Sequence, residues 1–136
     1  MRTVMQTTWT FQSCQINTST STTVFKMRYL YIWSNHLGRT CFGITSNPDN
    51  RKRKYEGHTG FEVNWTKLYA GPSNHIEDLE DRIKSEFWDH LFYTTTGKYE
   101  WIREDINTDQ IIQWLEWEVD NTYENVINEV DVITNT

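Results

Sequence analysis

The chain has 136 residues, a formal net charge of -6 and two cysteines, Cys14 and Cys41. This length fits one domain, and seven Trp, seven Tyr and six Phe supply much of the surface that a core must bury. Two cysteines are too few for a zinc site or a disulfide framework, so we expect a reducing, intracellular setting, cytoplasmic or nuclear. The chain has no signal-peptide pattern and no long apolar run, so we expect neither secretion nor a membrane partner.

Charge is spread unevenly along the chain. Residues 27 to 72 hold seven Lys and Arg against three Asp and Glu, whereas residues 73 to 136 hold four against sixteen. Such asymmetry allows one face to attract a polyanion although the whole chain is acidic. DNA is therefore a candidate partner despite the negative net charge.

The first 26 residues differ in composition from the rest. Thr, Ser and Gln dominate them, which predicts an extended N-terminal arm with little core of its own. No linker divides residues 27 to 136, so we expect them to form one domain.

A hairpin and a short helix are predicted to open this domain. Two segments rich in aromatic and aliphatic residues flank a turn-like "NHLGR", which predicts a β-hairpin over residues 28 to 45. Asn47 then suits a helix N-cap, Pro48 the first helical position and Gly57 a C-terminal stop. The expected helix covers about residues 48 to 56.

A third strand and a second helix are expected next. Alternation predicts the strand over residues 61 to 70, and "GP" ends it. Asn74 and Glu77 resemble a capping pair for a helix over residues 75 to 92. Its apolar residues fall on one stripe at helical spacing: Ile76, Leu79, Ile83, Phe87 and Leu91.

The C-terminal part favours a long, acidic amphipathic helix that begins after Thr108, preceded by a loop with a short edge strand. The expected fold class is α+β, with a small, mainly antiparallel three-stranded sheet flanked by helices. The apolar stripe of the last helix is Ile111, Ile112, Leu115, Val119, Tyr123, Val126 and Val130.

One carboxylate falls on the core-facing stripe of the second helix. Glu80 lies about 40° from Ile76 around the helix axis, among the apolar positions. A carboxylate there must be paired, protonated or bound to a cation to offset its desolvation. A salt bridge at the edge of the helix remains the simpler alternative.

The first helix carries four consecutive basic residues. Arg51 and Tyr55 stand four residues apart, so a guanidinium and a phenol share one face. Arg offers a planar fork that matches phosphate oxygens, while Lys52, Arg53 and Lys54 can track a nucleic-acid backbone. A solvated basic face or a localisation signal is the alternative for this run.

Together these segments resemble the GIY-YIG nuclease superfamily over about residues 28 to 120. Tyr31 matches the Tyr that ends the first motif, and Gly43 matches the Gly of the second. Arg51 and Tyr55 match the helical Arg and the His or Tyr four residues on, and Glu80 matches the later metal-binding Glu.

The segments "FGITSNPDNR" and "GKYEWI" resemble the branch of this family found in phage and other viral genomes. Two positions depart from the family pattern. Tyr29 replaces the Gly of the first motif, and Cys41 stands where the second motif usually has Tyr. Glu100, within "GKYEWI", is left without a role.

The resemblance implies a DNA endonuclease that hydrolyses phosphodiester bonds with one Mg²⁺ or Mn²⁺ held by Glu80. It makes Tyr31 the general base, Arg51 the group that opposes charge on the phosphate, and Tyr55 a hydrogen-bonding helper. Cutting both strands would require two visits or a homodimer. The alternatives are a catalytically silent domain of this type that binds DNA or a protein partner, and an acidic decoy that occupies a partner's DNA groove.

Overall fold

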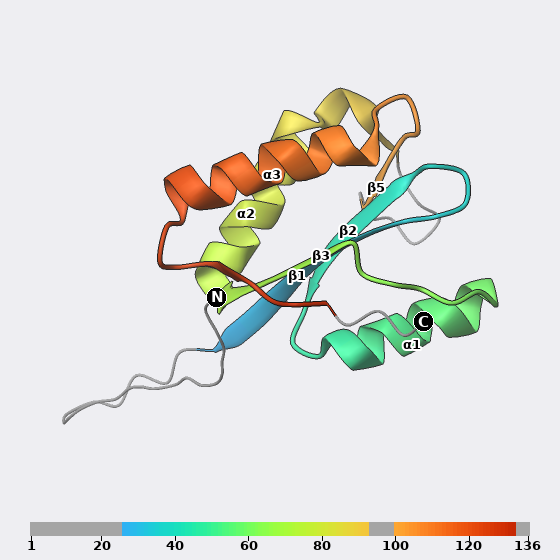
Figure 1. The fold of residues 1–136 in the computed structure, drawn as a ribbon, viewed down its shortest axis with the longest axis horizontal. Helices are drawn as coiled ribbons and strands as arrows, with labels where there is room; N and C mark the ends of the chain where they lie inside the picture. The colour runs from blue at the N-terminus through green and yellow to red at the C-terminus, as the bar shows by residue number, and fades with distance from the viewer. Residues whose placement is uncertain (1–25, 93–99, 133–136) are drawn as a thin grey trace.

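The computed structural model describes residues 26–92 and 100–132 and shows an α+β fold. The predicted N-terminal arm lies outside these residues apart from Lys26. An antiparallel sheet separates helix α1 from helices α2 and α3 (Figure 1). The elements are β1 (Met27–Ser34), β2 (Thr40–Thr45), α1 (Pro48–Thr59), β3 (Lys67–Pro72), α2 (Ser73–Glu86), the 3-10 turn η2 (Trp88–His90), β4 (Leu91–Phe92), β5 (Trp101–Ile102), α3 (Thr108–Thr122) and β6 (Asn128–Glu129).

The sheet has six strands in the order β4-β5-β2-β1-β3-β6, so the expected count of three is wrong. The predicted hairpin is present as β1 and β2, which pair antiparallel with Tyr31 opposite Gly43. The additional strands β4, β5 and β6 are two residues each. Such short strands carry no readable alternation, and only pairing with distant partners defines them.

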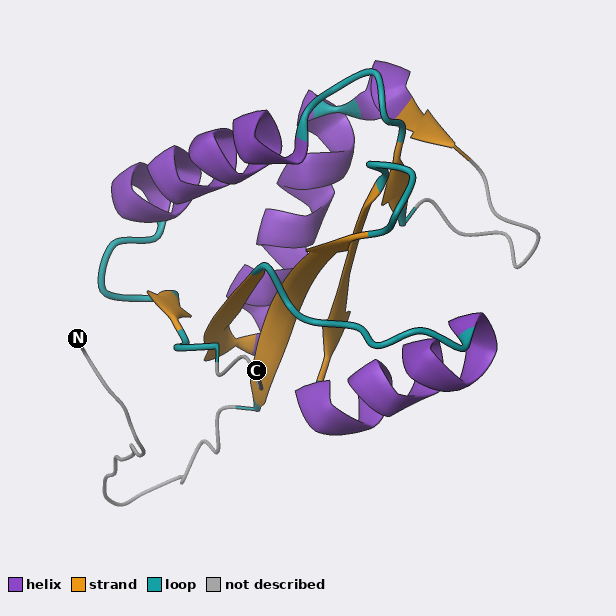
Figure 2. Ribbon diagram, turned by 45° about the vertical axis from the view of Figure 1, so that its right-hand side comes forward, coloured by secondary structure: helices purple, strands orange, loops and turns teal. Residues whose placement is uncertain are grey.

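Helices lie on both faces of the sheet (Figure 2), and each face carries a hydrophobic core. Alternate residues of β1 divide between them, because successive side chains in a strand point to opposite faces. Leu30 and Ile32 join the larger core beneath α2 and α3. The smaller core on the α1 side, called here the α1-side cluster, consists of Tyr31, Trp33, Cys41, Val63, Trp65 and Leu68.

Helix α1 begins as its sequence predicts and ends later. The Asn47 side chain accepts a hydrogen bond from the backbone N–H of Asn50, and Pro48 opens the helix. The predicted stop at Gly57 is wrong: the helix continues to Thr59, and Gly60 ends it at φ 76°. Both positions are glycines, but only Gly60 adopts the left-handed conformation that terminates a helix.

The third strand and the second helix also differ from their predicted ranges. Residues 61–66 form a connection, since the backbone N–H of Val63 is satisfied by the Glu56 carboxylate instead of a neighbouring strand. The strand begins at Lys67 and includes Gly71 and Pro72. Helix α2 starts at once, without the predicted side-chain cap, and ends at Glu86, before the 3-10 turn that leads into β4.

Helix α3 is shorter than predicted. Asn107 and Gln110 form a capping box at its start, and it ends at Thr122 instead of continuing to Val130. Asn125 has a positive φ of 63°, and the chain beyond it extends to form β6. Val126 packs on the larger core, as the predicted stripe required, but from a turn, and Ile127 joins the same core. Val130, the last residue of the stripe, packs instead on the α1-side cluster.

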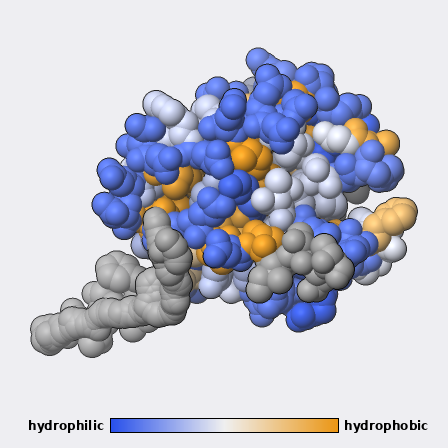
Figure 3. Space-filling view, viewed as in Figure 1, coloured by the Kyte–Doolittle hydropathy of each residue, from blue (hydrophilic) through white to orange (hydrophobic). Residues whose placement is uncertain are grey.

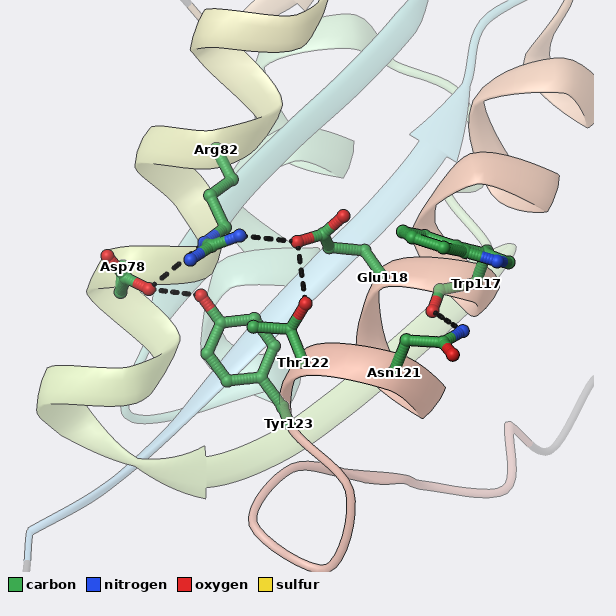
Figure 4. A network of polar contacts seen from close by, with 7 residues as sticks. All are labelled: Asp78, Arg82, Trp117, Glu118, Asn121, Thr122 and Tyr123. Atoms are coloured by element: carbon green, nitrogen blue, oxygen red, sulfur yellow. Dashed lines mark hydrogen bonds and ion pairs between the residues drawn. The ribbon is translucent and has the colours of Figure 1, made fainter.

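A polar network fastens α3 to α2 (Figure 4). Arg82 donates to the buried Glu118 carboxylate over 2.6 Å, and Thr122 donates to the same oxygen over 3.0 Å. The Tyr123 hydroxyl donates to Asp78, which also accepts from Arg82.

Among the described residues no helix has the length and apolar character needed to cross a bilayer.

Candidate functional site

Three of the predicted site residues meet on the α1 side of the sheet. Arg51 Nη1 donates to Tyr31 Oη over 3.0 Å, and the hydroxyls of Tyr31 and Tyr55 share a hydrogen bond of 2.7 Å. The Arg51 guanidinium also lies over the Tyr31 ring, 5.8 Å from its centroid. Tyr31 comes from β1, and Arg51 and Tyr55 come from α1. Because Arg51 and Tyr55 stand four residues apart on one face of the helix, both reach the Tyr31 hydroxyl.

Gly43 is the residue that permits this arrangement. It faces Tyr31 across the β1–β2 pair, and the phenol lies directly over its Cα. A Cβ added at Gly43 would lie 2.3 Å from Tyr31 Oη and 2.7 Å from Tyr31 Cζ, closer than non-bonded atoms approach. The position of the Tyr31 phenol therefore requires a glycine at residue 43.

The Tyr31 side chain is fully buried. Trp65 stacks on its ring with centroids 4.6 Å apart and planes at 30°. Burial raises the pKa of Tyr31 to about 12, against the opposing effects of the hydrogen bond with Tyr55 and the positive charge of Arg51. Burial also raises the pKa of Tyr55 far above its ordinary value, with the neighbouring Cys41 and Tyr31 adding to the rise. Both phenols are therefore protonated at neutral pH.

Cys41 joins the same hydrogen-bond chain. Its thiol donates to Tyr55 Oη over 3.4 Å, and the side chain is fully buried. Burial is the main cause that raises the pKa of the Cys41 thiol to about 12. The residue is thus a neutral donor that orients Tyr55, and not a thiolate.

Glu80 is placed apart from this cluster. It lies on α2, which packs on the other face of the sheet, and its ion-pair partner is Lys84 at 3.9 Å. Its side chain is 16% exposed. Burial is the largest cause that raises the pKa of Glu80, the charge of Lys84 opposes the rise, and the charges of Glu100 and Asp81 add to it. The contacts that define the tyrosine cluster do not include this carboxylate.

Glu100 connects the two regions electrostatically. Its backbone carbonyl accepts from the N–H of Phe42, which fixes it beside the middle of β2. Its charge contributes to the raised pKa values of Tyr31, Cys41 and Glu80. Glu100 therefore lies within electrostatic range of the two buried groups Tyr31 and Cys41 and of Glu80.

The remaining basic residues of α1 face solvent. Arg53 and Lys54 are exposed and Lys52 is half-buried. None of the three forms an ion pair with any residue in 26–92 or 100–132, so their charges are available to an external anion. No group of three or more His, Cys, Asp or Glu side chains within those ranges is arranged as a metal site.

Two contributors to the site have no role that the sequence alone assigns. Trp65 buries the Tyr31 ring from a connection that was predicted as strand, and Glu100 reaches the site through pairing with β2. Both contacts join residues far apart in the chain.

Comparison with known protein families, with curated proteins and with solved structures finds no match for this chain.

Proposed function

We propose that this protein is a divalent-metal-dependent DNA endonuclease that hydrolyses phosphodiester bonds. The observation that supports it is the junction of Arg51, Tyr31 and Tyr55 above Gly43. A guanidinium beside two phenols offers several donors to phosphate oxygens, and the exposed Arg53 and Lys54 on the same helix suit a DNA backbone. The GIY-YIG resemblance gives this junction its expected chemistry.

The metal ion, Mg²⁺ or Mn²⁺, would be held by Glu80. Its carboxylate is partly buried and near the negative charges of Glu100 and Asp81, an environment that a cation would relieve. Mg²⁺ suits such a site because it retains several waters and binds through one or two carboxylates together with substrate phosphates. When bound, the ion supplies positive charge to the scissile phosphate.

The protein's own residues divide the remaining work. Arg51 would oppose charge that develops on the non-bridging oxygens, and Tyr55 would hold a phosphate oxygen or the attacking water. Tyr31 would take the proton from that water. Because its pKa is about 12 in the free protein, the active phenolate is scarce at neutral pH, and the cleavage rate should rise with pH through the mildly alkaline range.

A catalytically silent domain that binds DNA is the second candidate. It is favoured by the complete burial of Tyr31 and by the neutral thiol of Cys41 in place of a phenol. In this function Arg51 and the exposed basic residues of α1 would hold the DNA backbone without cleavage. The silent domain requires salt-sensitive DNA binding, because phosphate contacts release counterions.

Plasmid nicking with added Mg²⁺ or Mn²⁺ separates the two candidates. The endonuclease predicts relaxed and linear products, which disappear in Glu80→Ala and Arg51→Lys but persist in Glu86→Ala, an exposed carboxylate on the same helix. A parent protein that does not nick, or nicking that is unchanged by Glu80→Ala, contradicts the endonuclease. Retention of DNA that is lost in Arg51→Ala without any nicking would establish the silent alternative.

A further inference from the structure

The C-terminal end of α1 exposes an aromatic side chain. Gly60 turns the chain out of the helix at φ 76°, and Phe61, the next residue, is 67% exposed. This is the largest exposed fraction among the large hydrophobic residues in the described ranges. Figure 3 shows a hydrophobic patch on the right-hand edge of the molecule, where α1 ends in Figure 1.

Phe61 borders an open pocket of about 450 Å³. The other residues that line it are Lys52, Glu56, Gly60 and Glu62. Glu56 is fixed in place because one of its oxygens accepts from the backbone N–H of Val63 over 2.8 Å. The pocket thus combines an aromatic ring, an ammonium group and carboxylates around a glycine that has no side chain.

This combination suits a nucleobase better than an apolar peptide. Aromatic side chains stack on the π-face of any base, and carboxylates accept hydrogen bonds from exocyclic amino groups such as N4 of cytosine. Lys52 adds a charge for the phosphate of the same nucleotide. A hydrophobic peptide would instead leave the Lys52 ammonium and the carboxylates without partners.

The neighbouring surface supports the same ligand. Lys52 lines the pocket and belongs to the basic run of α1, whose exposed members Arg53 and Lys54 form no ion pair with the residues that the structure describes. The His36 ring, 5.9 Å from the Phe61 ring, widens the aromatic surface there.

We propose that this pocket binds an unstacked nucleobase of single-stranded DNA, with Phe61 as the stacking surface and Glu62 as acceptor for a base amino group. The proposal rests on the DNA-binding part of the proposed function and specifies its substrate. Bases in an intact duplex are already stacked on their neighbours, so the pocket favours single strands, junctions and ends over continuous duplex.

Fluorescence anisotropy with a labelled single strand and its duplex, without metal, tests this selectivity. Phe61→Ala should weaken single-strand binding about tenfold and leave duplex binding unchanged, whereas Phe61→Trp should retain it. Trp117→Ala is the matched control, because Trp117 is an exposed aromatic residue on α3 with a similar exposed fraction of 60%. Both truncations remove exposed side chains, and equal unfolding midpoints would confirm that the variants fold.

The role of Glu62 is tested with homopolymers. Oligo(dC) presents amino groups and oligo(dT) does not, so Glu62→Met, which removes the acceptor oxygens, should reduce the preference for oligo(dC) while binding to oligo(dT) is retained. The pocket is contradicted if Phe61→Ala weakens single-strand binding no more than Trp117→Ala, if it weakens duplex binding equally, or if the parent binds no single strand.

Failure of the endonuclease proposal and failure of the pocket proposal give different results. A parent protein that does not nick but shows Phe61-dependent binding of single strands would support the pocket independently of the endonuclease. Nicking that is intact while Phe61→Ala has no effect on binding would overturn the pocket alone.

Discussion

Replacing Gly43 by alanine places a methyl group where the Tyr31 phenol lies. The new Cβ would be 2.3 Å from Tyr31 Oη and 2.7 Å from Tyr31 Cζ. The ring is fully buried and stacked on Trp65, so it cannot move aside without disturbing the α1-side cluster. Overpacking of this kind costs about 1 to 3 kcal/mol, and each hydrogen bond that Tyr31 Oη loses adds about 1 kcal/mol. With one or both of its two hydrogen bonds lost, the expected loss of unfolding free energy is about 2 to 5 kcal/mol.

Urea unfolding followed by tryptophan fluorescence measures this loss. Gly57→Ala is the control, because an added Cβ there meets nothing within 4 Å and the residue lies within α1. Alanine is favoured over glycine in a helix, so the control should be stabilised by up to about 1 kcal/mol. In a Tyr31→Phe background the contact with Oη no longer exists, and Gly43→Ala should destabilise less than it does in the parent.

Two results would refute this reasoning. A Gly43→Ala variant within about 0.5 kcal/mol of the parent would show that the Tyr31 phenol does not lie over the glycine. Equal effects of Gly43→Ala in the parent and in the Tyr31→Phe background would show that the hydroxyl is not the group in conflict.

Three further expectations concern the α2–α3 network and the buried phenol. Glu118→Gln should lower the unfolding midpoint by about 4 °C in a thermal melt, because the buried group loses its charge-assisted bond from Arg82; an unchanged midpoint would contradict this. The hydrogen bond from Tyr123, followed by the Arg82 contacts, lowers the pKa of Asp78, so its contribution is present above the ordinary carboxyl pKa and lost as pH falls through the lowered value. The difference in unfolding free energy between the parent and Tyr123→Phe, measured by urea titration, should therefore be larger at neutral pH than in acid. A difference that does not change with pH would contradict this role of Asp78. With a pKa of about 12, Tyr31 should not ionise in the folded protein near pH 10. An ultraviolet titration that compares the parent with Tyr31→Phe checks this. Folding stability should fall as pH rises above about 10, because Tyr31 ionises there in the unfolded protein but not in the folded one.

Local chemistry explains the elements that were predicted well. The Asn47–Pro48 pair begins α1 because a side-chain acceptor and a preset φ act within one turn of the chain. The hairpin follows from β-favouring segments around a turn, and the spacing of Arg51 and Tyr55 places both on one helix face. These inferences need only neighbours within a few residues.

The errors occur where distant partners decide the structure. Helix α3 ends at Thr122 although its apolar stripe continues, because the Tyr123 hydroxyl is bonded to Asp78 of α2 and Asn125 turns the chain into β6. Periodicity describes which residues are buried but not whether the backbone that presents them is helical or extended. The short strands β4 and β6 were missed for the same reason, whereas β5 lies in the segment for which a short edge strand was predicted.

The amino-acid sequence by itself determined the first hairpin, the start of α1 and the order in which Tyr31, Gly43, Arg51 and Glu80 occur. Only the tertiary structure decided that Tyr31 is buried beneath Trp65, that Cys41 donates to Tyr55, and that Glu80 lies on the opposite layer from the phenols. Capping and periodicity act over a few residues, whereas burial and pKa depend on side chains that packing brings together from distant parts of the chain.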